Sequence, residues 1–315
     1  MPFIAEGVIP ATLVAFHQDY EIDVEASRKH LRDVAAVDGL NAITVNGHAS
    51  EIHAFTLNEQ QRLLAESLEE VGDSLPLVNG VYADGSHAAV TVAKMSTTEG
   101  ASALLVFPPN SMSMGGQLCP EMAINHFIMI ASATDLPLIL FQYPASTGLG
   151  YPFETLLRIF EAVPSVVAIK DWCNDPMLHE RHIRTFQSLP RRVNVLSTHS
   201  SWLMASLSMA PAGLLSGAGS VIADLQVELF NAMQRNDLVS ARTINDRIYP
   251  LAQAFYRAPF LDMHNRMKEC LVLLGRLEEA VVRPPLQKLE ETEILFLEEA
   301  LVDAGLLGEV RRSFG

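Results

Sequence analysis

Short apolar runs, each followed by a stretch with helical periodicity, recur eight times before residue 225. Their spacing of roughly 20 to 35 residues fits one strand, one helix and the connecting loops. Strictly alternating strand and helix units produce parallel strands, and eight such units favour closure into a barrel. An open doubly wound sheet is the structural alternative, but no GxGxxG follows the first run. We therefore predict an α/β fold, a (β/α)8 TIM barrel, with strands at residues 8–16, 39–45, 75–81, 103–107, 137–142, 166–170, 194–197 and 213–216.

From about residue 225 the strand pattern stops and amphipathic helices replace it. They are expected at residues 225–234, 238–256, 263–274 and 290–304, with a break at Arg283-Pro284-Pro285 before the last. We predict a catalytic barrel over residues 1–224 and a C-terminal helical region over residues 225–315. The tail is too short and too apolar on one face to stand alone, so it should pack on the barrel or on another subunit.

The sixth apolar run ends abruptly on a charged residue. Val166, Val167, Ala168 and Ile169 are followed directly by Lys170, and the β-branched residues favour a strand buried on both faces. In a barrel of this kind, the carboxyl ends of the strands form the catalytic mouth. An amine that is partly desolvated there loses proton affinity and becomes a nucleophile toward carbonyl groups. The structural alternative is a strand-end lysine that reaches solvent.

Several segments together resemble one enzyme family. They are Lys170 followed by Asp171, the segment LFQYPASTG at residues 140–148, the loop GHASE at residues 47–51 and the helical tail. Over nearly the whole chain, these features are similar to the dihydrodipicolinate synthase and N-acetylneuraminate lyase family. The resemblance implies a (β/α)8 barrel in which Lys170 forms a Schiff base with the keto group of a 2-oxo acid. It also implies a homotetramer.

The departures from the family pattern indicate the reaction. Phe141 stands where most relatives carry a proton-shuttling tyrosine, and His48 and Ala49 replace the threonines that hold the substrate carboxylate. Ser146 stands where dihydrodipicolinate synthase itself has an arginine. These differences argue against that enzyme. The chain looks more similar to divergent members that dehydrate 2-keto-3-deoxy sugar acids.

Two histidines follow predicted strands at the catalytic mouth and are candidate acid or base groups. His48 follows the second strand and His199 the seventh. An imidazole that titrates near neutrality suits proton transfer to or from a hydroxyl group. A surface histidine is the alternative for each. His48 is the first choice and His199 the second.

Other residues at strand ends are candidates for substrate binding. Ser50, with Ala49 in the same loop, offers a hydroxyl or backbone N–H groups to a carboxylate. Phe141 and Tyr143 are candidates for an apolar pocket wall, and core packing is the alternative for both. Gly217 begins a glycine-rich turn that is similar to barrel phosphate sites, although such glycines also occur where two segments approach closely.

The charge and the cysteines exclude several classes of function. A net charge of −15 disfavours nucleic acid as a partner, because phosphate binding needs a basic surface. No run of apolar residues is long enough for a membrane span, and no signal peptide is evident, so we expect a cytoplasmic protein. Cys119, Cys173 and Cys270 form no CxxC pair, and no histidine motif for a metal is present, so neither a metal nor a cofactor is expected.

The leading hypothesis is a Schiff-base-forming lyase that acts on a small 2-oxo acid. Its first-choice reaction is the dehydration of a 2-keto-3-deoxy sugar acid. A pyruvate-dependent aldolase and an imine-dependent deaminase are alternatives that keep the imine. A non-catalytic ligand-binding barrel is the alternative from a different class, motivated by the missing tyrosine and threonines. A lysine enclosed in an apolar mouth without a function would be costly to desolvate, which argues against that scaffold.

Overall fold

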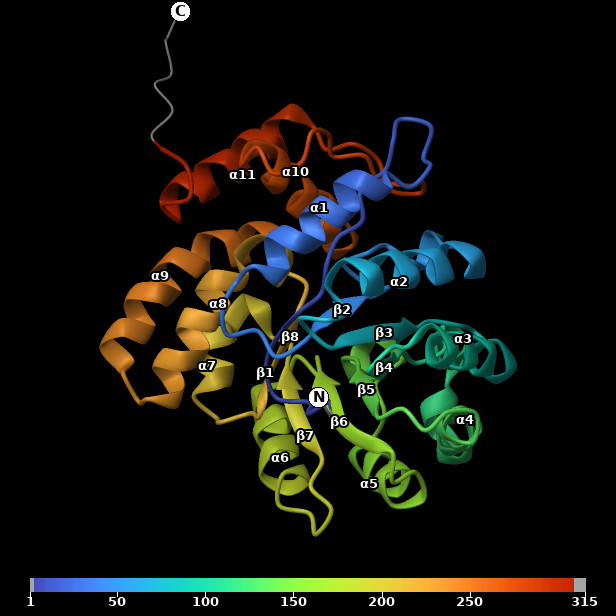
Figure 1. Ribbon diagram of the computed structural model, residues 1–315. Helices are drawn as coiled ribbons and strands as arrows, with labels where there is room; N and C mark the ends of the chain where they lie inside the picture. The colour runs from blue at the N-terminus through green and yellow to red at the C-terminus, as the bar shows by residue number, and fades with distance from the viewer. Residues whose placement is uncertain (1–2, 309–315) are drawn as a thin grey trace, which may run out of the picture.

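Eight parallel strands form the centre of the protein in a computed structural model that describes residues 3–308 (Figure 1). Neighbouring strands follow the order β1-β8-β7-β6-β5-β4-β3-β2. Isolated parallel bridges from Val8 to Leu40 and from Ala11 to Thr44 join the two ends of this order. The predicted (β/α)8 barrel is thereby confirmed. The strands are β1 Gly7–Pro10, β2 Ile43–Val45, β3 Leu77–Val81, β4 Ala103–Val106, β5 Leu138–Gln142, β6 Val166–Asp171, β7 Asn194–Ser197 and β8 Gly213–Ser216.

The first strand is shorter than predicted. It ends at Pro10, whereas the apolar run continues to residue 16. Proline has no N–H to donate to a neighbouring strand, which favours the end of regular pairing. Beyond it, Leu13, Val14 and Phe16 are still buried, but in a loop that packs on the barrel. Because residues 11–16 are buried, their sequence is as apolar as that of a strand, although they form a loop.

The barrel helices are α1 Val24–Ala35, α2 Leu57–Val71, α3 Ser86–Glu99, α4 Pro120–Ala131, α5 Phe153–Ala162, α6 Pro176–Phe186, α7 Leu203–Leu207 and α8 Gly219–Gln234. The start of α2 is a capping box. The Thr56 hydroxyl accepts a hydrogen bond from the Glu59 N–H, and the Glu59 carboxylate accepts one from the Thr56 N–H. This cap fixes where the loop after β2 ends and α2 begins.

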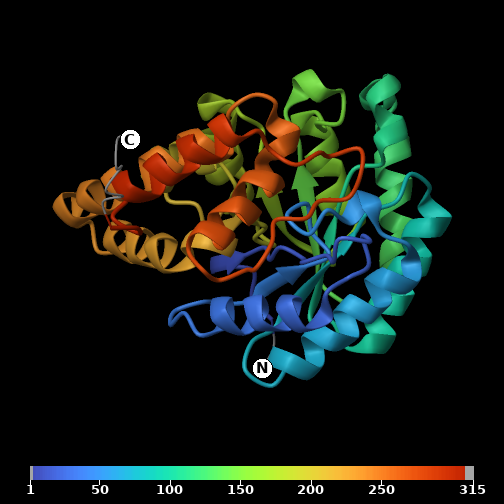
Figure 2. The same ribbon diagram turned by 90° about the horizontal axis from the view of Figure 1, so that it is seen from above.

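The C-terminal helices are α9 Leu238–Phe255, α10 Met263–Leu273 and α11 Glu291–Asp303. Figures 1 and 2 show α10 and α11, coloured orange to red, lying over one end of the barrel. Leu271 and Leu297 belong to the same hydrophobic core as Ile139 and Leu196 of the barrel. The tail therefore packs on the barrel of its own chain, one of the two expected arrangements.

The division of the chain at residues 224 and 225 stays a prediction. α8 runs across this point, with a non-helical backbone at Ile222. The expected break at residues 283–285 lies in the segment between α10 and α11. Residues 1–2 and 309–315, at the outer ends of the two predicted regions, lie outside the described residues.

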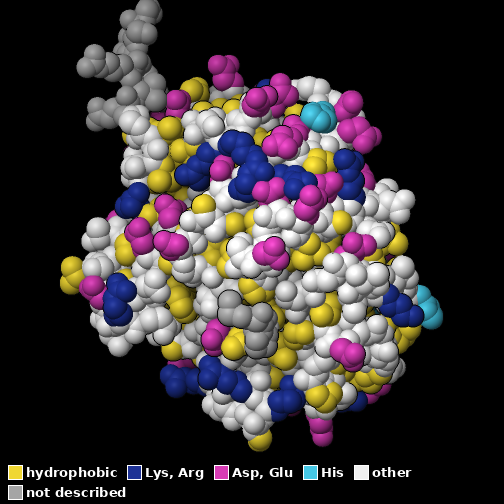
Figure 3. All heavy atoms as spheres, viewed as in Figure 1, with side chains coloured by type: hydrophobic (Ala, Val, Ile, Leu, Met, Phe, Trp, Pro, Cys, Tyr) yellow, Lys and Arg dark blue, Asp and Glu magenta, His cyan; other side chains and the backbone are white. Residues whose placement is uncertain are grey.

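Basic and acidic side chains lie among one another on the face shown in Figure 3. Arg28 of α1 contacts the carboxylates of Glu66 and Glu70 of α2 at 2.7 and 2.6 Å. Arg32 contacts Glu70 as well, at 2.9 Å. These pairs link α1 to α2 and offset the local basic charge. In the part of the chain that is described, no helix combines the length and apolarity needed to cross a membrane.

Candidate active site

Lys170 is the second-to-last residue of β6 and lies inside the carboxyl end of the barrel. Its side chain is buried, with 3% exposed, and this burial lowers its pKa to about 7. Strand pairing places it opposite Phe141 of β5 and Leu196 of β7. The Nζ atom lies 4.1 Å from the centre of the Phe141 ring. An amine in this setting is neutral in a large fraction of molecules at neutral pH, which is the state that attacks a carbonyl carbon.

A cavity with about 590 Å³ of empty space, its open mouth included, lies above Lys170. The loops after the strands supply one part of its wall, including His48 and Ala49 after β2, His199 after β7 and Gly217 after β8. The C-terminal region supplies the other part, with Tyr256, Phe260, Met263, His264 and Met267. The sequence therefore predicted the barrel side of this cavity. The contribution of the tail was not anticipated.

His48 lies between the aromatic wall and the tail. Its Nε2 atom is 3.2 Å from the Tyr143 hydroxyl, and its ring centre is 5.5 Å from that of Phe107 and 6.0 Å from that of Phe141. Burial, followed by the charge of Lys170, lowers its pKa to about 3. The premise that this imidazole titrates near neutrality is therefore wrong, because desolvation favours the uncharged ring. His48 is neutral at neutral pH.

Tyr143 does not itself line the cavity and reaches it through its hydroxyl contact with His48. Its ring lies 4.5 Å from Phe141 and 5.3 Å from Trp172, and burial raises the pKa of its hydroxyl. Phe141 and Trp172 line the cavity directly. Tyr143 therefore stands behind the wall that Phe141 forms.

His199 lines the cavity from the opposite side and is 2% exposed. Its ring stacks on Trp202 with a centre-to-centre distance of 4.1 Å. Its Nε2 atom lies 3.8 Å from Cys173 Sγ, and its Nδ1 atom has no hydrogen-bond partner among residues 3–308. Burial lowers its pKa to about 3, although the Asp171 charge acts in the other direction. His199 is also neutral, so the premise of titration near neutrality is wrong for this residue as well.

The other predicted binding residues divide into two groups. Ala49 and Gly217 line the cavity, and a Cβ atom added at Gly217 would lie 3.5 Å from the Ala49 Cβ. Ser50 does not line it. The Ser50 hydroxyl donates to the Thr12 carbonyl at 2.8 Å, and the Ser50 N–H donates to the Gly47 carbonyl at 3.2 Å. These hydrogen bonds hold the loop after β2 in shape, so Ser50 supports the site from behind.

One of the residues that sequence reasoning missed is His264, near the start of α10. It is 2% exposed, and its ring centre lies 5.9 Å from that of His48. A signal for it was present in the sequence. The run HNRMKE at residues 264–269 places polar groups all around a helix of the tail, and every residue of this run is buried. Buried polar residues require partners, which indicates a site or a network rather than a packing helix.

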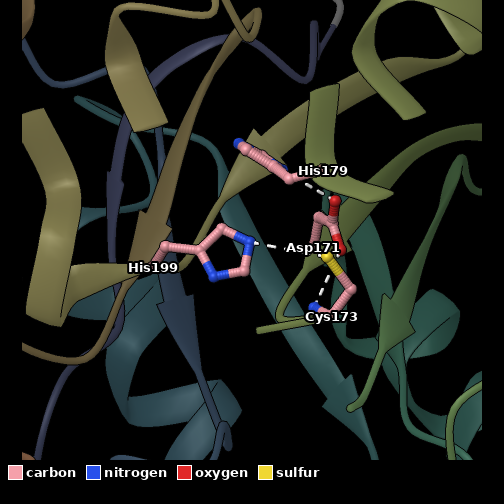
Figure 4. Close-up of side chains that lie close together, drawn as sticks. All are labelled: Asp171, Cys173, His179 and His199. Carbon is pink, nitrogen blue, oxygen red and sulfur yellow. Dashed lines mark hydrogen bonds and ion pairs between the residues drawn. The ribbon is translucent and has the colours of Figure 1, made fainter. Parts of the chain in front are cut away.

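Four buried side chains next to the cavity are of types that bind metal ions. One ligand atom from each of Asp171, Cys173, His179 and His199 lies within 4.8 Å of the others. Figure 4 shows the two imidazole rings pointing toward Asp171 and Cys173. Carboxylate, thiolate and imidazole together are ligands suited to zinc.

Hydrogen bonds already hold Asp171 within this cluster. Asp171 Oδ2 accepts from Nδ1 of His179 and of His182, each at 2.8 Å, and Asp171 Oδ1 accepts from the Cys173 N–H at 3.0 Å. The two histidines hold the pKa of Asp171 well below its usual range against the effect of burial. The cluster therefore fixes the loop after Lys170 without requiring an ion, and the expectation that the chain binds no metal stays a prediction.

Comparison with known proteins places the chain in one family. The model of the dihydrodipicolinate synthetase family matches residues 4–304. A DapA-like lyase of Halobacterium salinarum is 28% identical over 308 residues, which cover 97% of this chain and 96% of the relative. A 4-hydroxy-tetrahydrodipicolinate synthase of Chlorobium limicola is 27% identical over 307 residues, which cover 96% and 99%.

Solved structures show the same fold. A monomeric dihydrodipicolinate synthase variant superposes with a TM-score of 0.87 at 24% identity, covering 96% of this chain and 97% of the other. YagE of Escherichia coli K12, a prophage protein of the dihydrodipicolinic acid synthase family solved with pyruvate, gives 0.87 at 20% identity, covering 96% and 100%. Because the family model spans nearly the whole chain, this protein belongs to the dihydrodipicolinate synthetase family and is a lyase of the class I aldolase type.

Proposed function

We propose that this lyase removes water from a 2-keto-3-deoxy sugar acid through an imine on Lys170. The observation that carries the proposal is the buried Lys170 amine, with its pKa lowered to about 7, facing the phenyl ring of Phe141. The lysine supplies the nucleophile. The phenylalanine leaves the site without a phenol next to that nucleophile.

The reaction begins with attack of Lys170 Nζ on the C2 carbonyl carbon. Loss of the carbonyl oxygen as water gives a protonated imine, which withdraws electrons from C3 and makes a C3 proton acidic. A base takes this proton, and the C3–H electron pair forms an enamine. The enamine then expels the C4 hydroxyl, which leaves as water once it is protonated. Hydrolysis of the unsaturated imine releases the 2-oxo acid and restores the amine.

His48 is the first choice for the proton transfers and His199 the second. Burial lowers both pKa values to about 3, so each ring is uncharged and carries a lone pair that can accept a proton, with a lower proton affinity than an exposed imidazole. His48 accepts the C3 proton and returns it to the leaving C4 hydroxyl. Its contact with the Tyr143 hydroxyl, at 3.2 Å, fixes the orientation of the ring. A positioned group of this kind contributes to the rate as both base and acid.

Aldol cleavage is the second candidate, because the Tyr143 hydroxyl touches His48. In cleavage, a base must take the proton of the C4 hydroxyl while the C3–C4 bond breaks. Tyr143 and His48 together offer such a base, and this base does not involve the residue at position 141. Dehydration remains the preferred reaction because the phenol in this pair is held behind Phe141 and has a raised pKa.

The test is trapping with borohydride combined with product analysis. The protein is incubated with pyruvate, with 2-oxo acids of increasing length and with 2-keto-3-deoxy pentonate and hexonate, then reduced and mapped by mass spectrometry. We expect the adduct on the peptide that contains Lys170, its absence in Lys170→Ala and its presence in Lys94→Ala, a change at an exposed helix position. Product analysis should show an unsaturated 2-oxo acid or its tautomer.

Each other outcome has a defined meaning. Pyruvate together with an aldehyde would establish cleavage in place of dehydration, and ammonia released from an imino acid would establish a deaminase. An adduct on a different lysine, or none with any 2-oxo acid, would remove the proposal. We further propose that the protein acts in the cytoplasm as a homotetramer on this small-molecule substrate.

A further inference from the structure

The C-terminal region places a histidine in the cavity opposite the barrel loops. His264 is the second residue of α10, lines the cavity and is 2% exposed. Its Nδ1 atom is buried and receives no hydrogen bond from residues 3–308. A buried polar atom without a partner is uncommon, because it loses its hydrogen bonds to water without replacement. At the wall of a cavity, such an atom indicates a ligand that supplies the missing bond.

His264 lies beside His48 in the wall of the cavity. Its ring centre is 5.9 Å from that of His48, whose ring is in turn 6.0 Å from that of Phe141, the residue in contact with the Lys170 amine. The charge of Lys170 lowers the pKa of both His48 and His264. The rings of Phe141, His48 and His264 form a continuous row that begins at Lys170, so a substrate anchored on the lysine can extend along this row toward His264.

A buried ion pair fixes the spacing of the two histidines. Lys268, one helical turn after His264, donates to the carboxylate of Glu51, three residues after His48. Glu51 also accepts a hydrogen bond from the Arg283 N–H at 3.0 Å. This ion pair joins the loop after β2 to helix α10. It lies three residues along the chain from His48 and four residues from His264.

The chemistry of this end of the cavity favours hydroxyl groups. Burial lowers the pKa of His264 well below its usual value, and the neighbouring His48 and His53 rings act in the same direction. A neutral imidazole offers one donor and one acceptor, which matches a hydroxyl group that can both donate and accept. A carboxylate or phosphate only accepts and would need cations. Lys268, a cation of the same helix, is already paired with Glu51.

We propose that His264, together with His48, forms a distal subsite that binds a hydroxyl group of the substrate beyond carbon 4. This subsite selects hydroxylated 2-oxo acids over unsubstituted acids and over dicarboxylates. The inference rests on the proposed imine at Lys170, which fixes the near end of the substrate. To that function it adds the residue that selects the substrate, a polyhydroxy chain without a second charged group.

The test compares His264→Leu and His264→Asn with the wild type for four ligands. They are pyruvate, 2-oxopentanoate, 2-oxoglutarate and 2-keto-3-deoxypentonate, and the readout is the concentration for half-maximal borohydride trapping on Lys170. His87→Leu, the same change at an exposed histidine of α3, is the matched control. Loss of a hydrogen bond to a substrate hydroxyl should raise the value for the sugar acid about 10-fold in His264→Leu. Pyruvate, which ends before the subsite, should change less than twofold.

Three further results belong to the same comparison. The wild type should prefer the sugar acid to 2-oxopentanoate, and His264→Leu should lose that preference. His264→Asn, which keeps a donor and an acceptor, should recover part of it, and this variant also serves if His264→Leu does not fold. The control His87→Leu should behave as the wild type.

The inference is overturned if pyruvate and the sugar acid weaken equally, because His264 would then shape the whole site rather than a distal subsite. A wild-type preference for 2-oxoglutarate would also overturn it, in favour of an anion subsite. Unchanged values for all four ligands in both variants would show that no subsite exists. A wild type that forms no adduct with any of them contradicts the proposed imine itself, which is a separate failure.

Discussion

Lys268 Nζ lies 2.5 Å from Glu51 Oε1, and neither side chain is more than 1% exposed. This pair joins helix α10 of the tail to the loop after β2, and Lys268 donates a further hydrogen bond to the Val281 carbonyl at 2.8 Å. Each charge of such a buried ion pair needs the other, because an unpaired charge in a medium of low dielectric constant strongly destabilises the fold. The stability of the barrel and that of the tail therefore depend on the same buried ion pair.

Lys268→Met should destabilise the protein by about 3–5 kcal/mol, because it leaves the Glu51 carboxylate buried without its cation. Urea denaturation measures the loss. Lys29→Met, which removes a half-exposed pair with Asp33, is the control and should cost much less. Adding Glu51→Gln to Lys268→Met should restore part of the stability. Equal effects of the two lysine changes would contradict the role of the buried pair.

The rate of imine formation should rise with pH and level off just above neutrality. Only the neutral amine attacks the carbonyl, and burial lowers the pKa of Lys170 to about 7. The neutral fraction, and with it the rate of trapping by cyanoborohydride at low pyruvate, should increase about tenfold from pH 6 to pH 8. A rate that keeps rising to pH 10, as for an exposed lysine, would show that burial does not activate this amine.

His48→Ala should lower turnover by about 10² to 10⁴-fold, the usual contribution of a positioned acid or base, while the adduct on Lys170 still forms. His199→Ala tests the second choice in the same assay. Steady-state kinetics with a 2-keto-3-deoxy sugar acid, run beside borohydride trapping, separates proton transfer from imine formation. Full dehydratase activity in both variants would exclude both histidines from proton transfer.

Phe141→Tyr should introduce aldol cleavage. The ring centre lies 4.1 Å from Lys170 Nζ, so a phenol there stands next to the imine and can accept the C4 hydroxyl proton. We expect the formation of pyruvate from a 2-keto-3-deoxy sugar acid to rise at least about tenfold over the wild type, within the range for one positioned base. A lactate dehydrogenase-coupled assay measures it. No gain in a variant that still forms the adduct would mean that the residue at position 141 does not set the reaction.

The protein should be a homotetramer in solution. This expectation follows from the family resemblance, while part of the apolar surface of the tail is buried within its own chain. Exposed apolar side chains that remain for contacts between subunits include Val239, Tyr249 and Leu261. Light scattering at micromolar concentration measures the mass, and a monomer at that concentration would contradict the prediction.

The sequence alone predicted the barrel and placed Lys170 at its mouth. Eight apolar runs that alternate with helical stretches allow few arrangements besides a closed parallel sheet, and the run into Lys170 places that residue at the mouth of such a sheet. These features are local, so they can be read from neighbouring residues. The extent of β1 was overestimated because burial of residues 11–16 in a packed loop produces the same apolar pattern as a strand.

Only the tertiary structure decided which polar groups meet and in which charge state. His264 and His48 lie 216 positions apart in the chain, and Glu51 and Lys268 lie 217 apart, so no local pattern reveals either contact. The histidines were expected to titrate near neutrality, whereas burial lowers their pKa values and favours the neutral rings. Ser50 was expected to face the substrate, whereas the fold uses its hydroxyl to hold Thr12. Burial and partner choice depend on the whole packed molecule, and that is the physical reason the sequence could not provide them.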